Sequence, residues 1–390
     1  MDWALILEWV IKSFILVMML LTGFAYLTWY ERKVLSRMQV RYGPNRAGKF
    51  GLLQPIADAV KLIFKEELIP HEAEKIIFII APIVTVVPAV IITATVPWGP
   101  SFVAFGRTIN LYIANIDVAV LYVTAIAAIA VYGIVLAGWS SNNKYAMLGG
   151  LRSTAQMISY ELALGLSFAT VILFAGSMNM LAIVEAQKDM WFAVLQPTGA
   201  VIFLIATIAE LNRAPFDMPE AEQELTAGYH VEYSGMKFAL FFMAEYTKMI
   251  AISAIAATVF FGGYRELWFM RTGFLNFLSV DYVWHFGSVQ FSNWFLGPVY
   301  MFLKIVVLLF GMIWVRATLP RIRYDRLMSF GWKAILPLSL SLVLVSAVGI
   351  VLEQVNPLFI WFIPVASVLC GFVTIGLVDR SLRRKVYEAR

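Results

Sequence analysis

The sequence predicts an all-α integral membrane protein with about nine transmembrane helices and an amphipathic helix on the cytoplasmic side. Of its 390 residues, 61% are hydrophobic and only 14% are charged, and the mean hydropathy is +0.79. A soluble domain has to cover its surface with polar side chains, so water cannot be the main solvent of this chain. Long apolar runs separated by charged segments complete the prediction.

Nine of these runs are long enough to cross a bilayer, because about 20 helical residues span a hydrocarbon core of roughly 30 Å. Each is bounded by charged residues, glycine or proline. We expect each run to form one transmembrane helix. The runs are residues 5–29, 76–96, 118–139, 155–177, 192–209, 237–262, 295–318, 334–352 and 358–378.

The basic residues lie in alternate connections between the runs. Twenty-one of the 30 Lys and Arg residues fall in segments 31–75, 140–154 and 320–333, in the loop of Arg213 and in the tail from Arg380. By the positive-inside rule, these segments are cytoplasmic. We therefore expect a multi-pass membrane protein with its N-terminus outside and its C-terminus in the cytoplasm. This placement of charge explains the net +5 without a nucleic-acid partner.

The sequence argues against a metal or nucleotide centre on this chain alone. Cys370 is the single cysteine, which excludes a disulfide framework and disfavours an iron–sulfur cluster or a Cys-rich zinc site. The patterns G-x-G-x-x-G, G-x-x-x-x-G-K-[ST] and H-E-x-x-H are absent. We expect no metal site here and any metal redox centre on a partner.

The connection after the first run is too long for a simple turn. Pro55 opens a stretch with apolar residues at helical spacing, which predicts an amphipathic helix at the interface that is stopped by Pro70. Asp58, Lys61 and Lys65 share its polar face. This face is either a solvated, salt-bridged surface or part of a functional site near Arg32.

The connection after the fifth run is strongly acidic. Clustered carboxylates repel one another, so their titration is coupled where water is partly excluded. A solvated acidic loop is the alternative interpretation. Six carboxylates accompany Arg213 and His230 in this connection: Glu210, Asp217, Glu220, Glu222, Glu224 and Glu232.

Three glutamates extend this acidic character into the membrane. Glu161 and Glu245 lie inside apolar runs, and Glu210 lies at the cytoplasmic end of another. An ionised side chain at the bilayer centre costs roughly 2.5 to 3.5 kcal/mol, so such residues are candidates for function. Together they predict a proton relay of mostly protonated acids. For Glu245 an ion pair with Lys248, three residues onward on the same helix, remains an alternative.

Seven strings in the sequence form a recognisable set. They are Glu31-Arg32-Lys33, Arg41-Tyr42-Gly43-Pro44-Asn45, residues 51–61, Ile158-Ser159-Tyr160-Glu161, residues 209–217, Phe241-Phe242-Met243-Ala244-Glu245-Tyr246 and Pro320-Arg321-Ile322-Arg323-Tyr324-Asp325. Together they resemble the H subunit of bacterial proton-pumping NADH:quinone oxidoreductase, which is respiratory complex I; its mitochondrial homologue is subunit one. The resemblance covers approximately residues 1–352, and residues 353–390 add a further transmembrane helix and a basic cytoplasmic tail.

The resemblance implies a multi-pass subunit of the bacterial inner membrane that forms part of a quinone chamber and couples quinone reduction to proton translocation. Quinone is then a substrate, no cofactor is bound covalently, and iron–sulfur clusters and FMN belong to partner subunits. The expected partners are peripheral quinone-site and iron–sulfur subunits, small membrane subunits, antiporter-like subunits and membrane lipid. The implied chamber residues are Glu31, Arg32, Asp58, Phe242, Met243 and Arg316. The implied proton path is Tyr160, Glu161, Glu210, Asp217, Glu220, Glu232, Glu245 and Tyr246.

Two other functions compete with this one. A membrane anchor of an energy-converting hydrogenase shares the carboxylates but has no need for a long quinone channel, and the elaborate segment 42–70 favours the quinone interpretation. A free-standing ion transporter often shows inverted repeats with matching broken helices, which the sequence does not display.

Overall fold

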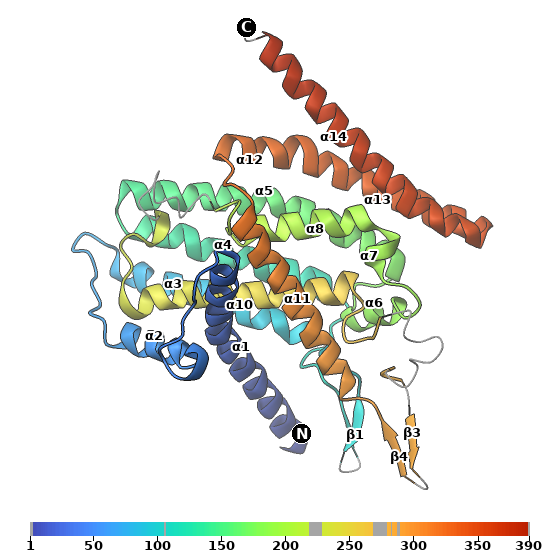
Figure 1. The fold of residues 1–390 in the computed structure, drawn as a ribbon, viewed down its shortest axis with the longest axis horizontal. Helices are drawn as coiled ribbons and strands as arrows, with labels where there is room; N and C mark the ends of the chain where they lie inside the picture. The colour runs from blue at the N-terminus through green and yellow to red at the C-terminus, as the bar shows by residue number, and fades with distance from the viewer. Residues whose placement is uncertain are drawn as a thin grey trace.

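The computed structural model describes residues 3–104, 107–217, 228–267, 279–281, 283–286 and 289–388. Helices dominate, and two short antiparallel hairpins are the described β-structure (Figure 1). The helices are α1 Trp3–Met38, α2 Gln54–Ile63, α3 Lys75–Ile91, α4 Ala119–Ser140, α5 Lys144–Ala175, α6 Met180–Ala186, α7 Phe192–Leu195, α8 Pro197–Glu210, α10 Gly235–Phe260, α11 Leu296–Thr318, α12 Tyr324–Phe330, α13 Leu336–Val355 and α14 Phe362–Glu388. The strands are β1 Phe102–Ala104, β2 Arg107–Ile109, β3 Val283–Phe286 and β4 Val289–Ser292.

The all-α membrane class is confirmed. Within the described residues, eight helical stretches are long and apolar enough to cross a membrane, and α8 is a shorter apolar helix. The expected run 155–177 begins earlier, because α5 extends back to Lys144. The expected run 5–29 continues to Met38, so α1 carries its charged end beyond the apolar segment.

Helix α10 forms the centre of the bundle, packed against α3, α11 and α1 (Figure 1). Every residue from Tyr246 to Phe260 is buried. Glu245 and Lys248 interrupt the apolar sequence of α10, and charged side chains within a membrane span face the interior of a bundle, which explains this position. Nearby, α3 and α4 approach so closely that a Cβ on Gly133 would lie 2.2 Å from Thr85 Oγ1.

The run 192–209 forms two helices instead of one. Gln196 has φ −136° and ψ 71°, outside the helical region, and it separates α7 from α8. Pro197 then begins α8, where its missing N–H costs no hydrogen bond. At 1.5 Å per residue, the 14 residues of α8 are about 21 Å long, less than the roughly 30 Å of the hydrocarbon core.

The amphipathic helix is shorter than expected. Helix α2 ends at Ile63, seven residues before Pro70. The chain beyond it is held to the start of α10: Ser234 Oγ accepts a hydrogen bond from Leu68 N at 3.2 Å and donates to Glu66 O at 3.3 Å. The segment before Pro70 was expected to be helical, but hydrogen bonds to Ser234 hold part of it instead. In Figure 1, α2 lies at the left and the two hairpins lie at the lower right.

The other end of α10 is capped by a lysine from α11. Lys304 Nζ donates to the carbonyl oxygens of Phe261, Gly263 and Arg265 at 2.6, 2.7 and 2.5 Å. It also lies 4.8 Å from the ring centroid of Trp191. A cation at a helix C-terminus satisfies carbonyls that have no helical partner and opposes the negative end of the helix dipole. Lys304 therefore fixes α11 to the end of α10.

Candidate functional site

A groove of about 360 Å³ lies between α1, α2 and α10. Four of the six residues expected at the quinone chamber line it together: Arg32, Asp58, Phe242 and Met243. Most of its other lining side chains are apolar, and Phe24 is one of them. An apolar groove with a few charges at one edge suits a ligand with a long apolar body and a polar head.

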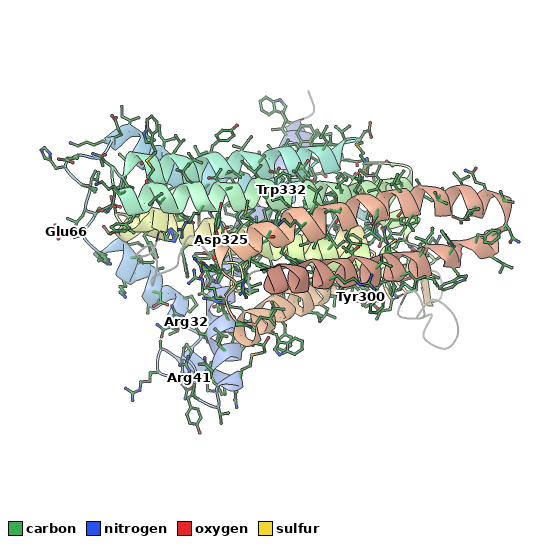
Figure 2. All side chains as sticks on the ribbon, turned by 90° about the horizontal axis from the view of Figure 1, so that it is seen from above. Arg32, Arg41, Glu66, Tyr300, Asp325 and Trp332 are labelled. Atoms are coloured by element: carbon green, nitrogen blue, oxygen red, sulfur yellow. The ribbon has the colours of Figure 1, made fainter. Side chains whose placement is uncertain are left out.

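A salt bridge joins the helices that form the groove. Arg32 Nη1 on α1 lies 2.8 Å from Asp58 Oδ2 on α2. Gln54 Nε2 donates to the other carboxylate oxygen of Asp58 at 3.0 Å. Figure 2 shows Arg32 and Arg41 on the segment of chain that projects from the bundle. Arg32 is exposed, so the pair adds little stability, and its main effect is to set the position of α2 against α1.

Behind the groove, α1, α10, α11 and the loop after α8 meet in a buried charged cluster. Tyr246 donates a hydrogen bond to Glu31 Oε2 at 2.6 Å, and Glu31 also pairs with Arg316. Arg213 Nη1 lies 3.5 Å from Glu31 Oε1, and the same guanidinium pairs with Glu245. The guanidinium carbon of Arg213 lies 4.2 Å from the centroid of the Tyr246 ring, a cation–π contact.

The cluster continues between α10, α8 and α5. Lys248 Nζ lies 2.9 Å from Glu210 Oε1, and Glu161 interacts electrostatically with both. Glu210, Glu245 and Lys248 line one cavity of about 40 Å³, which has room for water. The alternative in which Glu245 pairs with Lys248 on its own helix is not the pairing found: Glu245 pairs with Arg213, and Lys248 pairs with Glu210.

The cluster brings carboxylates and cations together in nearly equal number. Three cations offset the charge of three ionised carboxylates, so the cluster is closest to charge balance when one of its four acids is protonated. A state with most of the acids protonated carries a net positive charge. Burial against Phe238 and Phe241 lowers the pKa of His230 to about 4, so that its imidazole is neutral near pH 7. The carboxylates are Glu31, Glu161, Glu210 and Glu245; the cations are Arg213, Lys248 and Arg316.

The loop after α8 is shaped so that Arg213 points inward. Asn212 adopts φ 51°, which asparagine tolerates better than most residues, and its Nδ2 donates to Ser153 Oγ at 2.7 Å. Gln156 Nε2 on α5 donates to the carbonyl oxygens of Ala209 and Phe216, both at 2.8 Å. Gln156 thus holds both ends of the turn, and Arg213 is only 8% exposed between them.

Tyr160 lies outside the charged cluster, although it was expected on the same path. Its hydroxyl donates to Leu327 O on α12 at 3.0 Å. Its ring packs against Gly331, where an added Cβ would come within 3.3 Å of it. Tyr160 therefore joins α5 to the α12–α13 segment.

The expected residues of the acidic loop are only partly in place. Asp217 lies 3.8 Å from Arg321 Nη2 at the edge of the cluster. Glu232 accepts a hydrogen bond from Asn143 Nδ2 at 2.7 Å, beside the start of α5. Glu220 lies outside the described residues.

Tyr246 connects the groove to the cluster. Its ring centroid lies 4.6 Å from that of Phe242 and 6.1 Å from that of Phe24, both of which line the groove. Its hydroxyl binds Glu31, which does not line the groove. The chamber residues expected from sequence thus divide into two groups. Glu31 and Arg316 lie in the charged cluster, and the other four, Arg32, Asp58, Phe242 and Met243, line the groove.

The sequence is similar to one family over most of its length. The NADH dehydrogenase family matches residues 11–347. The H subunit of the NADH-quinone oxidoreductase of Thermomicrobium roseum is 45% identical over 350 residues, covering 87% of this chain and 95% of the relative. The H subunit of the same complex in Rhodospirillum rubrum is 48% identical over 339 residues, 87% of this chain and 92% of the relative. An H subunit from Syntrophobacter fumaroxidans is 46% identical over 336 residues, 86% of this chain and 93% of the relative.

Proposed function

The chain belongs to the NADH dehydrogenase family, and from this premise we propose that it forms the membrane wall of a quinone-binding chamber and couples quinone reduction to proton translocation. It is a multi-pass membrane subunit of an NADH-quinone oxidoreductase. Quinone is its substrate, and the flavin and iron–sulfur centres that deliver electrons belong to partner subunits. No step of electron transfer needs a redox group on this chain.

One observation carries the proposal: Tyr246 contacts the groove with its ring and the charged cluster with its hydroxyl. A reduced quinone near the groove demands protons and changes the local charge. The change in charge at the groove alters the electrostatic environment of Glu31 through its hydrogen-bond donor Tyr246. Arg213 couples Glu31 to Glu245, because its guanidinium pairs with both carboxylates. Further contacts lead from Glu245 to Glu210 and Glu161 through their shared cavity and Lys248.

The groove also bears on the alternatives. A hydrogenase anchor or a free-standing transporter would need the buried acids but not a lipid-facing groove closed by an amphipathic helix. The Arg32–Asp58 pair positions that helix over the groove. This arrangement suits an apolar substrate that enters from the membrane.

Replacing Arg32 by Gln or Asp58 by Asn is expected to reduce quinone turnover several-fold, because α2 loses its link to α1 at the groove. The clusters of partner subunits should remain reducible by NADH. The measurement is NADH:quinone activity in membranes, together with the iron–sulfur EPR signals. Glu67→Gln is the control, since it breaks a salt bridge to Lys237 outside the groove. Wild-type activity and inhibitor sensitivity in both variants would show that the groove is not the quinone site.

We also propose that the end of the protein that carries α2 faces the cytoplasm of a bacterium, and that the N-terminus faces outward. Single cysteines at Asn45, Asn143 and Arg323, in a chain with Cys370 replaced by Ser, are expected to react with an impermeant thiol reagent only from the cytoplasmic side. A cysteine at Asp117, in the connection before α4, should react only from outside. Labelling of Asn45 and Asp117 from the same side would refute this orientation.

A further inference from the structure

A second apolar hollow, of about 290 Å³, lies between α1, α10 and α11. It shares no lining residue with the groove described above. Leu20, Ile250 and Ile305 are buried beneath it, whereas Phe302 at its edge is exposed. These helices cross the membrane, so the hollow opens to the region of lipid chains.

Trp29 and Tyr30 mark the end of this hollow that lies toward the end of α1. Trp29 Nε1 donates to Phe50 O at 3.3 Å, in the chain that follows α1. Trp and Tyr side chains gather at the boundary between lipid chains and headgroups. The same two residues line an adjoining, wider hollow of about 740 Å³, together with Lys33 and Arg37. An apolar hollow thus continues into a basic one at the level of the headgroups.

Lys33 and Arg37 give this rim a positive charge without an acidic partner. They lie one turn apart on α1, and in the described part of the chain neither forms a salt bridge with a carboxylate. Lys33 Nζ lies 5.9 Å from the ring centroid of Trp29, and Arg37 is exposed. Glu31, the nearest acid in sequence, is buried on another face of α1 with Arg316 and Tyr246.

We propose that this site binds an anionic phospholipid, with an acyl chain in the hollow between α1 and α11 and its phosphate between Lys33 and Arg37. Basic pockets between transmembrane helices on the cytoplasmic side are suited to anionic headgroups. A free phosphate ion has no apolar part to occupy the hollow, so the hollow favours a lipid over phosphate alone. The site is separate from the quinone groove and does not depend on the function proposed for that groove.

The test is lipid retention by the detergent-purified complex, incubated with phosphatidylglycerol or phosphatidylcholine and analysed by mass spectrometry. A Lys33→Gln/Arg37→Gln variant should retain phosphatidylglycerol about 30-fold more weakly, because each basic residue near the surface contributes about a fivefold effect. Its retention of phosphatidylcholine should not change. Arg46→Gln is the matched control, because it removes an exposed basic residue that lines neither hollow.

A second variant tests the hollow while keeping the charges. Val306→Phe should narrow it and reduce the retention of both lipids. The proposal is overturned if the double variant retains phosphatidylglycerol as the wild type does. It is also overturned if that variant keeps the lipid but loses a peripheral subunit, which would make Lys33 and Arg37 a protein-docking surface. If the double variant fails to assemble, wild-type retention by Val306→Phe overturns the proposal in its place.

Discussion

Replacing Arg213 by Gln is expected to abolish most quinone turnover and to destabilise the membrane domain by about 3 to 5 kcal/mol, the usual cost of removing one partner of a buried ion pair. Arg213 is buried and pairs with both Glu31 and Glu245. Its loss leaves two carboxylates with less compensation. The measurements are NADH:quinone activity in membranes and assembly on native gels.

A double variant separates charge balance from function. Arg213→Gln/Glu245→Gln removes one charge of each sign, so assembly should recover while turnover stays low. Arg321→Gln is the control, because Arg321 lies 3.8 Å from Asp217 and is more exposed. An Arg213→Gln variant that assembles and turns over at the wild-type rate would rule out a role for this cluster in coupling.

Replacing Tyr246 by Phe is expected to lower turnover about 10- to 100-fold, the effect of losing a hydrogen bond to a charged group. The ring contacts with Phe24 and Phe242 should survive, so the groove keeps its shape. Glu31 loses its donor. If Tyr246 connects the groove to the cluster, proton translocation per quinone reduced should fall together with turnover.

The matched control is Tyr264→Phe. Tyr264 also donates to a carboxylate, Glu185 at 3.1 Å, but beyond the opposite end of α10. Its loss should leave turnover unchanged. Equal effects of the two substitutions would mean that any buried tyrosine hydroxyl supports activity through stability alone, and that Tyr246 has no special place in the path.

The membrane class and most helices could be predicted from sequence because apolar run length depends only on local composition. The ends of the helices were harder to predict. The helix α5 starts at Lys144 because Asn143 accepts a hydrogen bond from Tyr145 N, a local cap in a polar stretch without the apolar pattern. The helix α2 stops early because Ser234, distant in sequence, binds the chain that follows it.

The candidate site could be predicted residue by residue but not as a network. Buried acids stand out in an apolar run, which identified Glu161 and Glu245 as candidates. Their partners depend on which helices meet, and Arg213 lies in a loop where an arginine is normally solvated. Its burial depends on Gln156, whose contacts across more than 50 positions no sequence period reveals. The sequence signal closest to predicting this network was the charge pattern, since Arg213 is the single arginine in an acidic segment.

The short length of α8 bears on how this part of the chain enters the bilayer. Backbone groups beyond the ends of a helix of about 21 Å lie at a depth where lipid offers no hydrogen bonds. Two buried glutamines from other elements supply them: Gln156 binds the carbonyls of Ala209 and Phe216, and Gln187 Oε1 accepts from Phe192 N at 3.3 Å. Both partners belong to segments that pack against this part of the chain only in the assembled bundle. We therefore expect α8 to be stable in the bilayer as part of the packed bundle and not as a separate helix.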